Sequence, residues 1–204
     1  MIKSIRLALV SAAVVILGAM AFASTAQASR GISSSHTRIG VSGNLTMNGL
    51  VVCDVLLELT LASSSIAKST SPAQGTVTAG DIPRCSAGAT QGDILFPIPV
   101  SYASFNGTLP NISRINVTAG TVANPVGFFL EGLPFCAAGA LFGGAASPTM
   151  SGISFNVAGG QITGVTFNSA LNRNAGGALC PSRGTIEGTL TTFLNGVVVR
   201  VALV

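Results

Sequence analysis

The stretch Leu45–Leu61, LTMNGLVVCDVLLELTL, decides the fold because apolar and polar residues alternate along most of it. Successive side chains of an extended chain point to opposite faces of a sheet, so this alternation is typical of a β-strand with one buried face. Apolar residues and glycine occupy the odd positions, whereas Asp54 and Glu58 lie on the opposite face. We therefore expect one long strand, bent or bulged at Gly49, with Cys53 pointing into the core.

The dipeptide Asn48-Gly49 offers a different interpretation, because it favours the two-residue turn of a β-hairpin. In such a hairpin Met47 would face Leu50, and Asp54 would then turn towards the core. A buried carboxylate without a partner is costly, so we prefer the single bent strand.

Alternation recurs along the rest of the chain, between residues that favour turns. It predicts further strands near 76–79, 93–102, 115–117, 126–130, 153–157 and 162–167, the last of them with a bulge at Gly164. Apolar residues at alternate positions on both sides of Asn195-Gly196 predict a C-terminal hairpin that pairs 186–194 with 197–203. Because no long segment has helical periodicity, we expect an all-β fold, an antiparallel β-sandwich or a barrel-like fold.

Three regions follow one another along the chain. Lys3 and Arg6 precede an apolar run that ends in small residues, which predicts a cleaved signal peptide over 1–28. The serine-rich segment 29–43, which contains His36, is expected to be flexible. Residues 44–204 are expected to form a single β domain without a transmembrane segment, secreted or held at the cell surface.

Four cysteines, an even number, lie in the part of the chain that follows the predicted signal peptide. In an oxidising compartment such a set indicates two disulfides, for which three connectivities are possible. We prefer the pairing that closes the shortest loops, which joins Cys53 to Cys85 and Cys136 to Cys180. The close cysteine or histidine pairs of metal sites are absent from the sequence, so we expect no bound metal.

Composition argues against several classes of function. Charged residues make up 8% of the chain, where about 25% is usual, and the basic ones after the signal peptide are scattered singly, so we expect no nucleic-acid partner. The only histidine, His36, lies in the segment expected to be flexible, and Asp54 and Glu58 are too far apart along a strand to act as a glycosidase pair. We expect no enzyme activity, no catalytic residue and no cofactor.

Three segments resemble a family of small exported bacterial proteins, the alkane-oxidation activators of the PraA/PraB type. They are Leu50-Val-Val-Cys53, Gly132-Leu-Pro-Phe-Cys136, and Cys180 followed by Gly184-Thr-Ile-Glu-Gly-Thr-Leu190. The chain departs from that family in longer connections and in Phe135, where tryptophan is commoner. The resemblance implies an all-β extracellular protein that takes part in hydrocarbon uptake or in adhesion within biofilms, without catalytic residues.

These observations predict a secreted, non-enzymatic surface protein. Its expected partners are cell-surface or matrix components, or apolar material such as alkanes, because a surface poor in charge favours apolar contacts. Self-association is the second possibility, because residues 43–53 also resemble the early cysteine strand of chaperone–usher pilin subunits. Such a pilin-like structural subunit would assemble by adding a strand to an open sheet edge.

Overall fold

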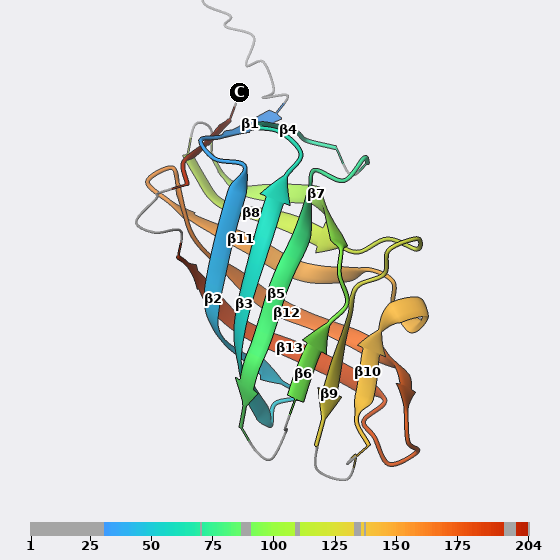
Figure 1. The fold of residues 1–204 in the computed structure, drawn as a ribbon. Coiled ribbons are helices and arrows are strands. Elements are labelled where there is room, and N and C mark those ends of the chain that lie inside the picture. Colours follow the sequence, from blue (N-terminus) through green and yellow to red (C-terminus); the bar gives the residue numbers. More distant parts are fainter. Residues whose placement is uncertain are drawn as a thin grey trace, which may run out of the picture.

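The computed structural model describes residues 31–69, 71–86, 91–108, 111–132, 136, 138–193 and 199–203. The predicted signal peptide over 1–28 therefore lies outside the described residues. Within them the chain is all-β, which confirms the predicted class (Figure 1). The elements are β1 (Gly31–Ser34), β2 (Arg38–Met47), β3 (Val51–Leu61), β4 (Ser65–Ala67), β5 (Gly75–Cys85), β6 (Gln91–Ile94), β7 (Ile98–Thr108), β8 (Asn111–Ala119), β9 (Gly127–Glu131), β10 (Ala140–Gly143), η1 (Gly144–Ala146), β11 (Met150–Ala158), β12 (Gln161–Gly176), β13 (Arg183–Thr192) and β14 (Val201–Leu203).

Eight strands form a closed, barrel-like ring in which each strand pairs antiparallel with both of its neighbours. Their order is β2, β3, β5, β7, β8, β11, β12 and β13, after which β13 pairs with β2 again. The inward side chains of these strands form the hydrophobic core, and the most deeply buried include Val51, Cys53 and Leu190. No helix within the described ranges is long and apolar enough to cross a membrane.

A second group of strands, β6, β9 and β10, branches from the ring through β12. The first half of β12 pairs with β11, and from Arg173 onward its other end pairs with β10, which in turn pairs with β9. β9 then pairs with β6, and β6 lies beside β5 at the lower right of Figure 1. The predicted single strand over 93–102 is therefore wrong, because β6 and β7 belong to different parts of the sheet.

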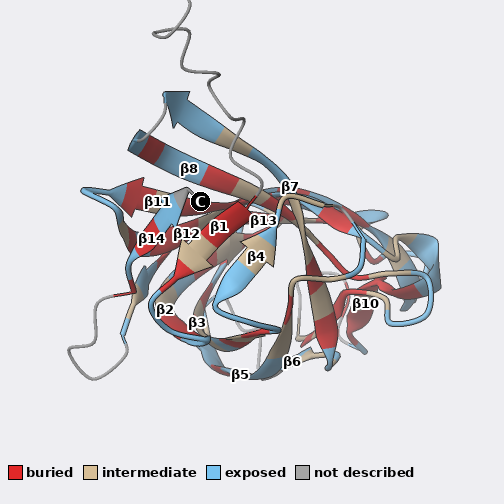
Figure 2. Ribbon diagram, turned by 90° about the horizontal axis from the view of Figure 1, so that it is seen from above, coloured by how far each residue is buried: buried red, intermediate tan, exposed pale blue. Residues whose placement is uncertain are grey.

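A short sheet of β14, β1 and β4 lies across one end of the ring (Figure 2). Its central strand pairs Ile32 with Leu203 on one side and with Ile66 on the other. The predicted C-terminal hairpin is thus wrong, because 201–203 pair with β1 rather than with β13; the turn residues Asn195-Gly196 lie outside the described residues. The expectation of a flexible 29–43 is wrong for 31–43, most of which belongs to β1 and β2.

The stretch Leu45–Leu61 is a hairpin, so the preferred single bent strand is wrong and the turn at Asn48-Gly49 is correct. Both turn residues have positive φ, and the Leu50 amide donates to the Met47 carbonyl at 3.2 Å. Leu50 is an extra residue without a cross-strand partner, so Met47 pairs with Val51. This one-residue shift keeps most of the odd positions buried and places Asp54 and Glu58 on the outer face, which removes the objection to a hairpin.

The irregularity predicted at Gly164 lies one residue away. In the β11–β12 pair, Asn156 is opposite Gly164 and Val157 is opposite Ile162, which leaves Thr163 as the extra residue. A bulge re-aims the side chains that follow it, so both Ile162 and Val165 point inward and are buried.

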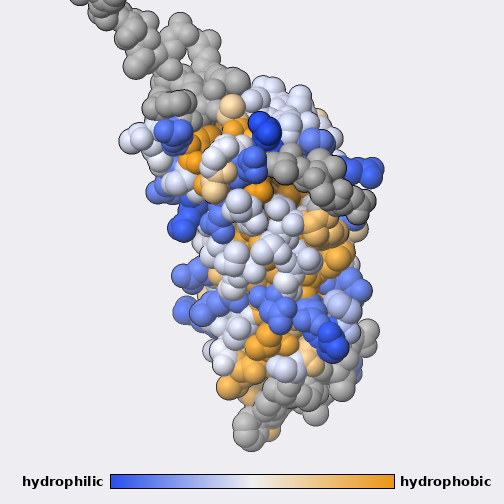
Figure 3. Space-filling view, turned by 90° about the vertical axis from the view of Figure 1, so that its left-hand side faces the viewer, coloured by the Kyte–Doolittle hydropathy of each residue, from blue (hydrophilic) through white to orange (hydrophobic). Residues whose placement is uncertain are grey.

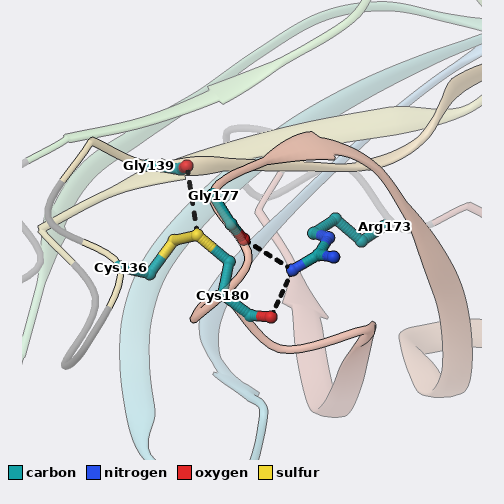
Figure 4. The surroundings of a disulfide bond; sticks show 5 residues. All are labelled: Cys136, Gly139, Arg173, Gly177 and Cys180. Atoms are coloured by element: carbon teal, nitrogen blue, oxygen red, sulfur yellow. Dashed lines mark hydrogen bonds between the residues drawn. A yellow bond between two sulfur atoms is a disulfide. The ribbon is translucent and has the colours of Figure 1, made fainter.

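Both predicted disulfides, Cys53–Cys85 and Cys136–Cys180, are confirmed. The second bond is embedded in a hydrogen-bonded loop (Figure 4). Arg173 Nη1 donates to the carbonyl oxygens of Gly177, at 2.8 Å, and of Cys180. Since one guanidinium group binds two carbonyls of this turn, the arginine holds the loop against the end of β12.

Candidate functional site

A cavity of about 100 Å³ lies within the ring, and its lining residues are all apolar or glycine. Ten strands contribute to the lining: eight from the ring, together with β6 and β9. Most of the lining side chains are valine, isoleucine and leucine, with Ala119 as the smallest side chain. The cavity is therefore a space within the hydrophobic core rather than a cleft lined by reactive groups.

The cavity arises from the size of the ring and the size of its side chains. The interior of an eight-stranded ring is just wide enough for side chains to fill it or for one small ligand. This chain has no tryptophan, and Phe128, Phe155 and Phe167 are the only aromatic side chains in the lining. Medium-sized aliphatic side chains reach towards the axis from all sides without meeting completely, and a void remains.

The chemistry of the lining selects an apolar occupant. A buried water needs two to four polar partners, and an apolar cavity of comparable size in another protein stays dry and binds benzene or xenon. The lining residues offer no polar side chain to such a water. A small molecule without hydrogen-bonding groups gains dispersion contacts there and desolvates no polar group.

A smaller cavity of about 40 Å³ lies between the first one and the sheet of β14, β1 and β4. The two cavities share a wall, formed by Ile39, Leu59, Val100, Val117 and Phe155. The smaller cavity also has polar lining residues, among them the chain's only tyrosine, Tyr102. Burial raises the pKa of the Tyr102 phenol above its ordinary value, because it disfavours the ionised form.

The structure separates the polar residues that the sequence singled out. His36 is exposed, and its Nδ1 lies 2.8 Å from the Ser35 hydroxyl oxygen. Asp54 forms an ion pair with Arg84 at 2.9 Å, and Glu58 is exposed on β3. Among the described residues, no group of three or more histidine, cysteine, aspartate or glutamate side chains could hold a metal ion.

Large apolar side chains are also exposed at several places on the surface. Leu50, in the β2–β3 turn, is 68% exposed, and Val52, near the start of β3, is 39% exposed. Leu179, beside Cys180, is 80% exposed. In Figure 3 hydrophobic residues are interleaved with hydrophilic ones along one face and gather towards its lower end. Part of the outer surface is thus able to contact apolar material.

Sequence reasoning did not find the cavity. Each lining residue has the alternating apolar signature of an ordinary core position, and nothing in a single sequence shows that opposing side chains fail to meet.

No family model, no curated protein and no solved structure matches this chain.

Proposed function

We propose that this chain is a non-enzymatic protein of the cell exterior that binds small apolar molecules and contacts apolar surfaces. The observation that carries the proposal is the apolar cavity of about 100 Å³ inside the ring. A protein core is normally packed as densely as an organic crystal, so an unfilled space of this size forgoes contacts that the chain could have made. A ligand of matching shape restores those contacts.

Two features support a location outside the cytoplasm. Cys53–Cys85 and Cys136–Cys180 are both formed, and such bonds persist in oxidising compartments. The signal-like sequence over 1–28 would direct the chain there. The exposed Leu50, Val52 and Leu179 would supply contacts to hydrophobic material or to a biofilm matrix.

The experiment is a binding titration with a pair of ligands that differ in one hydroxyl group. Benzene and xenon should bind the folded protein with its disulfides intact, as followed by changes in the methyl NMR signals of Val100, Val117 and Ile153, which line the cavity. Phenol should bind far more weakly, because its hydroxyl group would be buried without a partner. If neither benzene nor xenon binds, the proposal is wrong.

A second candidate function, assembly by strand addition, is favoured by the free edge of β7. β5 pairs with β7 only at Ile98, Pro99 and Val100, so within the described residues 101–108 pair on one side alone, with β8. Figure 2 shows this β7–β8 arm extending from the ring with exposed residues at its end. Edge strands of this kind can accept a strand from another chain.

Light scattering of the purified protein over a range of concentrations tests this candidate. Assembly through β7 predicts oligomers that dissociate when Ala103, which is exposed on β7, is replaced by lysine, since an edge lysine opposes pairing. A wild-type protein that stays monomeric at every concentration would exclude strand addition between copies.

A further inference from the structure

Two neighbouring strands in the wall of the larger cavity, β5 and β6, are held together by side-chain packing, without a backbone ladder among the described residues. The β5–β7 ladder ends at the pair Val77–Ile98, and beyond it β5 runs beside β6. No ladder joins β5 to β6 in the described part of the chain, whereas all the ring strands are joined by backbone hydrogen bonds. We call this join, between 77–85 of β5 and 91–96, the β5–β6 seam.

The least buried part of the lining of the larger cavity lies at this seam. All but three of its lining residues are buried, and the three exceptions are Leu57, Val77 and Ile94. Val77 and Ile94 belong to the two sides of the β5–β6 seam, and Leu57 is paired with Gly80 of β5. The seam is therefore the part of the cavity wall whose lining residues are least buried.

The β5–β6 seam is filled by side chains packed against glycines. A Cβ atom on Gly80 would lie 2.8 Å from Leu57 Cδ2 and 2.9 Å from Phe96 Cζ, closer than carbon atoms approach, and one on Gly92 would lie 2.8 Å from Ile82 Cγ2. Phe96 is half-buried, packs against the hydrophobic core and lines neither cavity, and the tip of its ring lies beside Gly80 and the cavity-lining Leu57. Rotation of this ring requires no backbone hydrogen bond to break.

We infer that the β5–β6 seam is the entrance to the larger cavity and that Phe96 is the side chain that closes it. The inference rests on the proposed function, since it concerns how an apolar molecule reaches the same site. The competing route, beneath β14, β1 and β4, is blocked by three paired strands and leads first into the smaller cavity. A small apolar molecule therefore enters when the Phe96 ring swings away from Gly80.

Exchange of xenon and benzene between the free and bound states, measured by NMR, tests the inference. Phe96→Ala should raise the association and dissociation rates together, each by about tenfold, and change Kd less than about threefold, because a gate outside the site alters the barrier rather than the bound state. Phe96→Leu should give intermediate rates. Phe105→Ala is the matched control, because Phe105 is also half-buried and lines neither cavity.

Three outcomes would overturn the inference. Unchanged rates in Phe96→Ala would show that the ring is not the gate, and equal acceleration by Phe105→Ala would show general loosening. Faster exchange in Ile66→Ala but not in Phe96→Ala would place the entrance beneath β4, where Ile66 lines the smaller cavity. Each of these leaves wild-type binding, and hence the proposed function, intact; absence of wild-type binding removes both.

Discussion

Asn48 and Thr185 exchange two hydrogen bonds. The backbone amide of Asn48 donates to the backbone carbonyl of Thr185 at 3.0 Å, and the backbone amide of Thr185 donates to the side-chain Oδ1 of Asn48 at 2.9 Å. These two hydrogen bonds hold the β2–β3 turn against the start of β13, the strand that pairs with β2 on the side opposite β3. One asparagine thus sets both the turn conformation, at φ 55°, and the position of the turn against its neighbour.

Asn48→Ala should lower the free energy of unfolding by about 1–3 kcal/mol, because the Thr185 amide loses its acceptor and alanine is strained at positive φ. Urea denaturation measures the change. Asn48→Gly should cost less than Asn48→Ala, because glycine adopts this φ without strain. An equal cost for both variants would mean that the backbone conformation contributes nothing.

The Asn48-Gly49 turn could be read from the sequence, but the path of the strand after it could not. A type I′ turn alone would have placed Asp54 inside, and only the extra Leu50 makes the hairpin compatible with the apolar pattern. Local sequence carries no sign of one unpaired residue. Pattern reasoning therefore recovered which residues are buried, the strand class and the disulfides, and it failed where register depends on a single bulge.

The sequence pattern also could not show which strands pair when they are distant in sequence. The apolar alternation after 196 is compatible with a hairpin to β13 and equally with pairing to β1. In the folded chain 201–203 pair with β1. The cavity was invisible for a related reason, because alternation identifies inward side chains without showing whether they touch across the ring.

Ala119→Leu should fill the larger cavity. The added carbons extend into space that Ala119 lines, so benzene binding should be lost and the free energy of unfolding should rise by about 0.5–2 kcal/mol. Calorimetry and thermal unfolding measure the two effects. Ala158→Leu adds the same atoms at an exposed position and is the matched control. A destabilised Ala119→Leu variant that still binds benzene would contradict the described cavity.

Loss of either disulfide should destabilise the chain by about 3–4 kcal/mol on the chain-entropy estimate. The paired variants Cys53→Ala/Cys85→Ala and Cys136→Ala/Cys180→Ala separate the two bonds, with urea denaturation as the measurement. The second pair should cost slightly more, because it closes a separation of 44 residues rather than 32. The reverse order would show that contacts in the folded state outweigh loop entropy.

Alkaline pH should destabilise the protein through Tyr102. Its pKa is raised in the folded state by burial, so the folded chain holds the phenol proton more tightly than the unfolded chain does. This stability is present below the unfolded pKa of about 10 and is lost as pH rises through the folded value. Wild type should therefore lose stability faster above pH 10 than Tyr102→Phe, in urea denaturation at stepped pH. Tyrosinate absorbance reports Tyr102 alone, because the chain has no other tyrosine.

The pairing of Ile32 with Leu203 places the two ends of the described chain in one small sheet. During synthesis β1 is made before the other described strands and its partner β14 after them, so this sheet forms only after all the strands between the two have been produced. Closure of that end of the ring is consequently a late event in maturation. A chain released before residue 201 would leave β1 without one of its two neighbours, exposed to proteolysis and to pairing with other chains.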